Sequence, residues 1–227
     1  VGGWTPGATR ALADVSAWRP LVIGHMRRLG VDSIPIAIFI AVFTGIVLAL
    51  LASYIFTGAM PLYMVGALVG KTVMMELGPV LTGMALAGRV GANIAAEIGT
   101  MRVTEQLDAL EALATEPVHY LFVPRIIAGI VMLPFLTILG DVLGMFGGYL
   151  VAVKLLGANP IIYNANSYQF LKMNDIWSGA IKAAFFGLIL TLTGCVRGYF
   201  TTGGAEGVGR ATTHAVVSAS LIILLSD

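Results

Sequence analysis

The hydrophobic positions of this chain form long, nearly unbroken runs, unlike the alternating or one-sided patterns of a water-soluble domain. From Ile34 onward these runs recur with only brief polar breaks. Because a transmembrane helix needs roughly 20 consecutive apolar residues, the pattern predicts an all-α integral membrane protein with five spans. The expected spans cover residues 34–56, 62–87 with an extension open as far as 96, 121–153, 176–196 and 212–225.

Three connecting segments have compositions of their own. Residues 10–30 mix apolar side chains with arginines, which favours a helix lying in the membrane interface over a disordered tail. Residues 156–175 are rich in Asn and Tyr and residues 198–209 in Gly, so both are expected to be loops. We expect a single domain over residues 1–227, with the transmembrane region at 34–225. Its last span is expected to be cut short, because the sequence stops inside an apolar run.

Composition and charge agree with a membrane location. Hydrophobic residues make up 58% of the chain and charged residues 11%, whereas a soluble domain carries roughly 25% charged residues. Five spans would place the N-terminal segment and every second connecting segment on one side of the membrane. All nine arginines fall in these segments. The loops expected on the other side carry only Lys154 and Lys172. The positive-inside rule therefore predicts a cytoplasmic N-terminus and a C-terminus on the opposite side of the membrane. A formal net charge of +1 argues against a nucleic-acid partner.

Four ionisable residues lie inside the expected spans, where a charge costs roughly 2.5–3.5 kcal/mol and is a functional candidate. They are Lys71, Glu76, Asp141 and Lys182. Glu76 precedes Gly78-Pro79, which should bend the helix, and an acid at a bend suits a polar cavity. The alternative is a carboxylate tied to a neighbouring helix for packing. Lys71 is expected to extend toward the outer interface. For Lys182 the same behaviour competes with pairing to Asp141 or contact with a lipid phosphate.

Small residues line one face of the second span and one face of the third. They recur at four-residue intervals, at Gly83, Ala87, Gly91 and Ala95, and at Gly140, Gly144 and Gly148. Such faces let helices approach closely. Spacing alone leaves open whether they serve packing within the chain or a subunit interface.

The polar segment between the second and third spans, residues 97–117, predicts a short amphipathic helix ended by Pro117. Its apolar positions follow one helical stripe: Val103, Leu107, Leu110 and Ala114. Its acidic positions lie on other faces: Glu105, Asp108 and Glu111. Because an acidic helix is disfavoured beside anionic lipid, docking to a cytoplasmic partner is preferred to passive membrane contact. We expect Glu105→Lys or Leu107→Asp to uncouple the activity of such a partner from that of the membrane-spanning part while folding survives.

No enzymatic constellation is apparent in the sequence. The three histidines, His25, His119 and His214, lack metal-ligand spacing, and no serine stands in order with a histidine and an acid. The single cysteine, Cys195, allows no internal disulfide. The segment 66–72 resembles a phosphate-binding loop but is one residue short and follows no strand. We expect no cofactor in this chain and no bound ATP.

Several stretches of the sequence are specific enough to suggest a family. They are Glu76-Leu-Gly-Pro79, Ala87-Gly-Arg-Val-Gly91, residues 96–110, Pro124-Arg125 and residues 204–213. In these the chain resembles the MlaE family, the permease subunits of bacterial lipid ABC transporters, related to the YrbE proteins of Mce systems and to plastid lipid importers. The likeness covers residues 35 to 225 in order. Position 75 is Met in this chain, whereas some relatives carry a basic residue immediately before the glutamate that corresponds to Glu76.

The resemblance implies a homodimer in the bacterial inner membrane with two copies of a cytoplasmic ABC ATPase, which would bind ATP and Mg²⁺. It also implies a periplasmic Mce-domain protein and a small accessory subunit as partners, and phospholipid as the transported substrate. Outer-membrane lipid asymmetry would be the process served. The implied substrate-binding candidates are Leu48, Ala52, Phe56 and Glu76, joined by Lys182 for its reach to a phosphate. The ATPase-coupling candidates are Glu97, Arg102, Glu105, Leu107, Asp108, Leu110 and Glu111.

Two other classes of function stay open. A secondary transporter could use Glu76 as a proton or ion carrier, but it would show inverted repeats, and the sequence has no convincing internal repeat. A membrane scaffold for the Mce-type protein would have the same spans without transport.

Overall fold

Five long apolar helical segments dominate the computed structural model, which describes residues 15–55, 64–113 and 117–227, with side chains from residue 19 onward. They cover residues 19–55, 64–103, 117–155, 173–199 and 204–226, and each is long and apolar enough to cross a membrane. Every element in the described ranges is helical. The prediction of an all-helical protein with five candidate spans is therefore confirmed.

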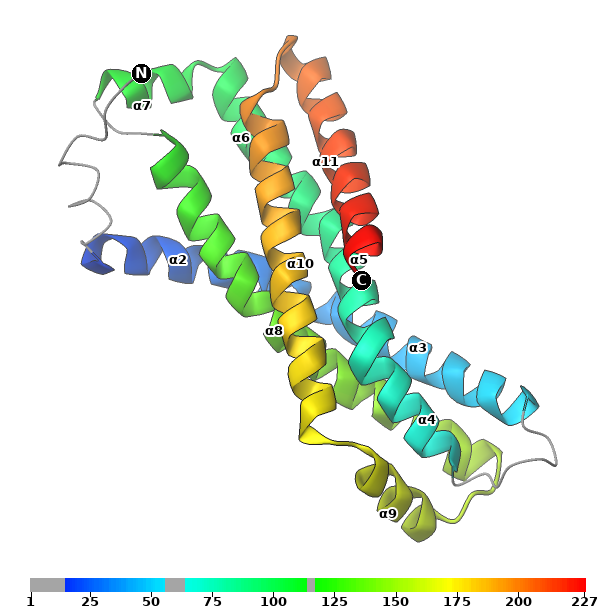
Figure 1. The fold of residues 1–227 in the computed structure, drawn as a ribbon. Coiled ribbons are helices and arrows are strands. Elements are labelled where there is room, and N and C mark those ends of the chain that lie inside the picture. The colour runs from blue at the N-terminus through cyan, green and yellow to red at the C-terminus, as the bar shows by residue number, and fades with distance from the viewer. Residues whose placement is uncertain (1–14, 56–63, 114–116) are drawn as a thin grey trace.

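The helices gather into one bundle, with the short helix α7 at one end and α9 at the other (Figure 1). We call these the α7 end and the α9 end. The main helices are α2 (Val15–Leu29), α3 (Ile34–Ile55), α4 (Met64–Thr72), α5 (Gly78–Leu86), α6 (Ala92–Val103), α7 (Gln106–Ala112), α8 (Pro117–Leu150), α9 (Pro160–Phe170), α10 (Met173–Tyr199) and α11 (Gly204–Ser226).

The first segment consists of two helices joined by a tight 3-10 turn, η1 (Val31–Ser33). Ser33 is buried, and its hydroxyl donates to the Leu29 carbonyl over 2.7 Å. α2 packs against α8 and runs across the direction of α10 and α11 (Figure 1). A helix thus exists where the interfacial helix was expected, while its place in a membrane interface stays a prediction.

The second segment is one continuous helical run in which two wider π-helical turns interrupt the α-helix. They are η2 (Val73–Leu77), which contains Glu76, and η3 (Ala87–Gly91). Pro79 explains the first, because proline has no N–H to donate and its ring collides with the carbonyl four residues earlier in a regular α-helix. In η2 the Gly78 N–H bonds instead to the Val73 carbonyl. The expected bend at Gly78-Pro79 is thus a widened turn, a feature frequent at functional sites.

Glycines of α8 and α10 bring neighbouring helices into backbone contact. A Cβ on Gly144 would lie 3.1 Å from the Ala41 carbonyl oxygen of α3, and one on Gly45 would overlap the Gly144 carbonyl. On the other small-residue face, Gly83 of α5 lies against Phe186 of α10. Both predicted faces therefore serve packing within the chain, which resolves the alternative that spacing left open.

The Gly-rich loop predicted at residues 198–209 is wrong over most of its length. α10 continues to Tyr199 and α11 begins at Gly204 rather than near Thr212. The turn between them needs only Gly203 and Gly204, whose φ angles of +89° and +67° are reached at low cost by glycine. The remaining glycines of this stretch lie inside α11 or at the end of α10.

The loop predicted at residues 156–175 is also wrong, because it contains the helix α9. The Asn159 side chain accepts a hydrogen bond from the Ile161 N–H over 3.0 Å, and Pro160 occupies the first helical turn. Asn followed by Pro is a helix-start signal that the sequence carried. α9 packs on α4 through Tyr163, and burial raises the pKa of the Tyr163 hydroxyl to about 12.

α8 and α10 occupy the centre of the bundle, and α10 packs against α5, α6, α8 and α11. Its Phe186 and Leu190 are fully buried in the main hydrophobic cluster. The candidate site lies where α10 meets the η2 turn.

Candidate functional site

Three charged side chains meet in an ionic cluster, two of them from spans and the third from the residue that follows α11. The Lys182 Nζ of α10 donates to Glu76 Oε2 of η2 over 2.7 Å and to Asp227 Oδ1, after α11, over 3.0 Å. The side chain of Glu76 is 50% exposed and that of Lys182 27% exposed. The cluster is therefore accessible, although it joins residues far apart in sequence.

Local geometry explains why these residues meet. A Cβ on Gly179 would overlap the Met74 carbonyl oxygen, so the missing side chain lets α10 lie directly on η2. Lys182 stands one helical turn after Gly179 and reaches across to Glu76, two residues after Met74. The close approach at Gly179 and the widened turn before Pro79 together place the ammonium against the carboxylate.

The cluster has two carboxylates for one ammonium, so it can hold a ligand of mixed charge. Lys182 can donate to a phosphate oxygen, and the half-exposed Glu76 can accept from an ammonium headgroup. The alternative in which Glu76 is tied to a neighbouring helix is realised in this pairing, yet half of its side chain stays open. The ion pair therefore agrees with the second interpretation, and a polar cavity at Glu76 stays a prediction.

The pairing of Lys182 with Asp141 is wrong. Asp141 is 4% exposed on α8 and lies against Gly78, where an added Cβ would overlap its Oδ1. That oxygen has no hydrogen-bond partner among the described residues. Asp141 therefore touches the helix that carries Glu76 but takes no part in the cluster. Lys71 is exposed on α4, as expected of a lysine extending toward an interface.

The apolar candidates of the first span lie apart from the ionic cluster. Ala52 is 3% exposed in a small cluster with Val69 and Val73, and Leu48 packs on the edge of that cluster. Phe56 lies outside the described residues. The accessible apolar surface of α3 is offered by other positions: Phe39, Phe43, Val47, Leu51 and Ile55.

The polar segment after α6 forms a helix, but its bounds differ from the predicted stripe. Val103 ends α6, and a turn at Glu105, whose φ is +60°, separates it from α7. Leu107 is fully buried in the main cluster, so the expectation that Leu107→Asp leaves folding intact is contradicted. Glu105, Asp108 and Glu111 are exposed, and Leu110 is half-buried. Arg102 of α6 donates to Asp108 over 2.8 Å.

Glu97 joins three elements rather than standing on a free surface. Its Oε2 pairs with Arg125 of α8 at 2.9 Å, and its Oε1 with Arg28 of α2 at 3.6 Å. The Arg125 side chain is only 3% exposed. Nearby, Arg89 donates to the Ser33 hydroxyl over 2.6 Å. These contacts tie the helix before α7 to α2 and α8.

Sequence reasoning missed Asp227, Arg28 and Arg125 as partners of the candidate residues. The rule that charges inside membrane helices pair with one another could have prompted the search. It could not choose the partner, because the three segments that meet at Lys182 are not neighbours in sequence.

The described residues thus place a polar cluster among five segments that are each long and apolar enough to span a membrane. Comparison with known proteins identifies the family: residues 22–227 match the family model described as Permease MlaE. The chain belongs to the MlaE family of ABC transporter permeases, which are non-catalytic subunits.

Individual relatives agree with this assignment. A probable ABC transporter permease protein of Rickettsia prowazekii is 45% identical over 207 residues, covering 91% of this chain and 80% of the relative. The intermembrane phospholipid transport system permease protein MlaE of Haemophilus influenzae is 37% identical over 213 residues, covering 92% and 80%. The chloroplastic protein TRIGALACTOSYLDIACYLGLYCEROL 1 of Arabidopsis thaliana is 35% identical over 218 residues, covering 96% and 62%.

Proposed function

We propose that this chain is the permease subunit of an ABC transporter that moves phospholipid between the bacterial inner membrane and a periplasmic Mce-type carrier. Such transport would contribute to outer-membrane lipid asymmetry. The observation that carries the proposal is the accessible cluster of Glu76, Lys182 and Asp227 among the apolar spans of a permease family. The phospholipid transport named for the Haemophilus relative supports the substrate class.

The cluster would bind the headgroup by exchanging internal partners for those of the lipid. Lys182 already spans two carboxylates, so a phosphate can replace one of them without leaving the ammonium unpaired. The released Glu76 would then accept from an amine group where the headgroup has one. Exchange of this kind keeps binding weak enough for release, since each hydrogen bond to the lipid takes the place of one within the protein.

The acyl chains would lie along the accessible apolar face of α3 and its partner surface in a homodimer. Leu48 borders this face, while Ala52 supports it from behind by packing on α4. Phe56, beyond the described part of α3, remains a candidate by position.

An ABC ATPase, two copies for the homodimer, would dock on α7. Glu105, Asp108 and Glu111 offer exposed carboxylates to a basic partner surface, while Leu107 anchors α7 to the bundle and Leu110 borders the contact. Arg102 and Glu97 would transmit the movement, Arg102 through its ion pair with α7 and Glu97 through its ion pairs with α8 and α2. ATP and Mg²⁺ would be bound by that partner, and no cofactor by this chain.

The protein would lie in the inner membrane with its α7 end in the cytoplasm. The arginines Arg102, Arg197 and Arg210 stand at or near that end, whereas Lys154 and Lys172 border α9, which agrees with the positive-inside rule. The periplasmic carrier would then approach the α9 end. A small accessory subunit would complete the complex.

Reconstitution with the ATPase and the carrier tests the proposal. Proteoliposomes containing a fluorescent phospholipid report ATP-dependent transfer, and we expect Lys182→Gln to lower its rate about tenfold, corresponding to roughly 1.4 kcal/mol of lost headgroup interaction. Lys71→Gln is the matched control, because Lys71 is an exposed lysine of α4 outside the cluster. ATP hydrolysis should persist in both variants.

Other results would favour the other classes. Transfer that follows a proton gradient and ignores ATP would indicate a secondary transporter. Wild-type complex that retains no phospholipid in native mass spectrometry and transfers none would indicate a scaffold. Unchanged transfer in Lys182→Gln would contradict the role of the ionic cluster.

A further inference from the structure

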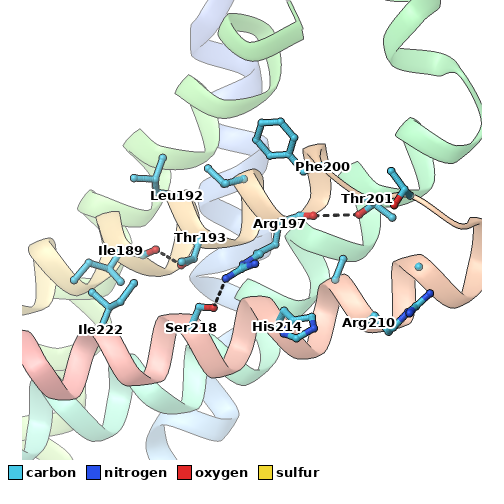
Figure 2. A pocket seen from close by; sticks show the side chains of 14 residues that line it. Ile189, Leu192, Thr193, Arg197, Phe200, Thr201, Arg210, His214, Ser218 and Ile222 are labelled. Atoms are coloured by element: carbon cyan, nitrogen blue, oxygen red, sulfur yellow. Dashed lines mark hydrogen bonds between the residues drawn. The ribbon is translucent and has the colours of Figure 1, made fainter.

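A groove of about 680 Å³ opens between α10 and α11, displaced from the ionic cluster toward the α7 end. Its lining changes along its length. Ile189, Leu192 and Ile222 lie at the end nearer the cluster, whereas Arg197, Arg210 and His214 lie further toward the α7 end (Figure 2). None of the described residues that line the groove is acidic, so one end is apolar and the other is basic.

Arg197 is the most informative side chain of the groove. It belongs to a segment long and apolar enough to span a membrane, and it reaches across to α11, donating to the Ser218 hydroxyl over 3.0 Å (Figure 2). Within the described ranges it has no ion pair with a carboxylate, in contrast to Arg28, Arg102 and Arg125. Arg197 lies exposed in the last turn of α10, and a guanidinium has five N–H donors, so it has donors left for a further partner. An anion in the groove would supply that partner.

We propose that this groove binds the phosphate of a membrane phospholipid, with the acyl chains running along Leu192, Ile189 and Ile222. The basic end matches a phosphate, which guanidinium groups bind with two parallel hydrogen bonds. The apolar end matches the upper part of the chains, and the volume lies within the range of ordinary ligand sites, roughly 300–1,000 Å³. The site is separate from the Glu76 cluster and does not depend on transport. The groove lies toward the α7 end, so the orientation proposed above would place it in the cytoplasmic leaflet, and only this placement rests on the proposed function.

Charge favours a lipid over a second copy of this chain as the occupant. In a two-fold symmetric contact centred on the groove, the same surface of both copies would meet. Arg197 would then face its own counterpart, and the described residues of the lining offer no carboxylate to balance the two charges. Glu206, which lies 3.7 Å from Arg210 on exposed α11, is not part of the lining. A phosphate removes this repulsion.

Photolabelling of the whole complex tests the site. The complex is placed in lipid nanodiscs that contain phosphatidylglycerol with a diazirine on one acyl chain, and labelled peptides are identified by mass spectrometry. We expect labels on the groove residues of α10 and α11. Labels on the exposed face of α3, at Phe39 and Phe43, serve as an internal standard that reports correct folding.

Arg197→Gln should lower groove labelling about tenfold relative to the α3 standard, because a charged pair to phosphate is lost. Arg197→Lys keeps the charge and should retain most of the labelling. Arg27→Gln is the matched control, since Arg27 is an exposed arginine of α2 that does not line the groove. Equal labelling in wild type and Arg197→Gln, or equal loss in the Lys and Gln variants, would overturn the proposal.

Two further arms separate the occupants. Diacylglycerol with the same diazirine should label the groove weakly, since it lacks the phosphate, and labelling equal to that of phosphatidylglycerol would refute phosphate binding. Excess inorganic phosphate should leave labelling unchanged, whereas displacement would mean a site for a free anion and refute the lipid. A disulfide between two copies carrying His214→Cys and Cys195→Ala, together with an unlabelled groove, would mean that a second copy covers it and would also refute the proposal.

Discussion

Replacing Arg125 with methionine removes the buried half of the ion pair that joins α8 to α6. The Arg125 side chain is 3% exposed, and its contact with Glu97 measures 2.9 Å. Breaking a buried, hydrogen-bonded pair by removing one partner costs about 3–5 kcal/mol. Because Glu97 is 39% exposed, water recovers part of the carboxylate solvation, and methionine keeps the apolar stem. We therefore expect the free energy of unfolding to fall by about 2–3 kcal/mol.

The matched control is Arg28→Met, which removes the other cation beside Glu97. Its side chain is 67% exposed and its guanidinium lies 3.6 Å from the carboxylate, so the loss should stay below about 1 kcal/mol. Unfolding of the purified protein in mixed micelles with increasing sodium dodecyl sulfate, followed by far-ultraviolet circular dichroism, measures both changes.

A third variant isolates the pair itself. In a protein that already carries Glu97→Gln, Arg125→Met should cost clearly less than in the wild type, because the carboxylate that needs a cation is gone. Equal losses for Arg125→Met and Arg28→Met would refute the argument from burial. So would an undiminished loss for Arg125→Met when it is combined with Glu97→Gln.

Two further predictions concern packing and coupling. Gly187→Leu should destabilise the bundle by about 3 kcal/mol or more, because even a Cβ there would overlap the Gly129 carbonyl oxygen. The control in the same unfolding assay is Gly209→Leu, at a position of α11 where an added Cβ would meet no neighbouring atom. Glu111→Lys should weaken ATPase binding several-fold and leave the fold intact, because the Glu111 side chain is exposed. Leu107→Asp should instead lower the free energy of unfolding by about 3 kcal/mol or more, because it buries a charge. Pull-down of the ATPase together with circular dichroism distinguishes these outcomes, and normal ATPase binding by Glu111→Lys would argue against docking on α7.

The sequence was sufficient for the features that depend on neighbouring residues. Runs of apolar residues determined the spans, since each must be long enough to cross the hydrocarbon and satisfy its backbone internally. The motif at Glu76-Leu-Gly-Pro79 pointed to the family that the comparisons confirm. Two local signals misled where asparagine or glycine was taken for a loop, because α9 and the start of α11 are helices.

The tertiary structure decided which distant residues meet. Glu76 and Lys182 are 106 positions apart. Their pairing depends on the close approach of α10 to η2 at Gly179, and no pattern of neighbouring residues in the sequence indicates that these two segments touch. Tertiary packing also decided the role of Leu107. The helical stripe of apolar residues that contains it predicted a docking face, but the Leu107 side chain is fully buried. Periodicity identifies an apolar side of a helix, and only the packing of the whole bundle determines what that side contacts. The sequence by itself therefore determined the membrane class and the candidate charges, and the folded chain determined their partners.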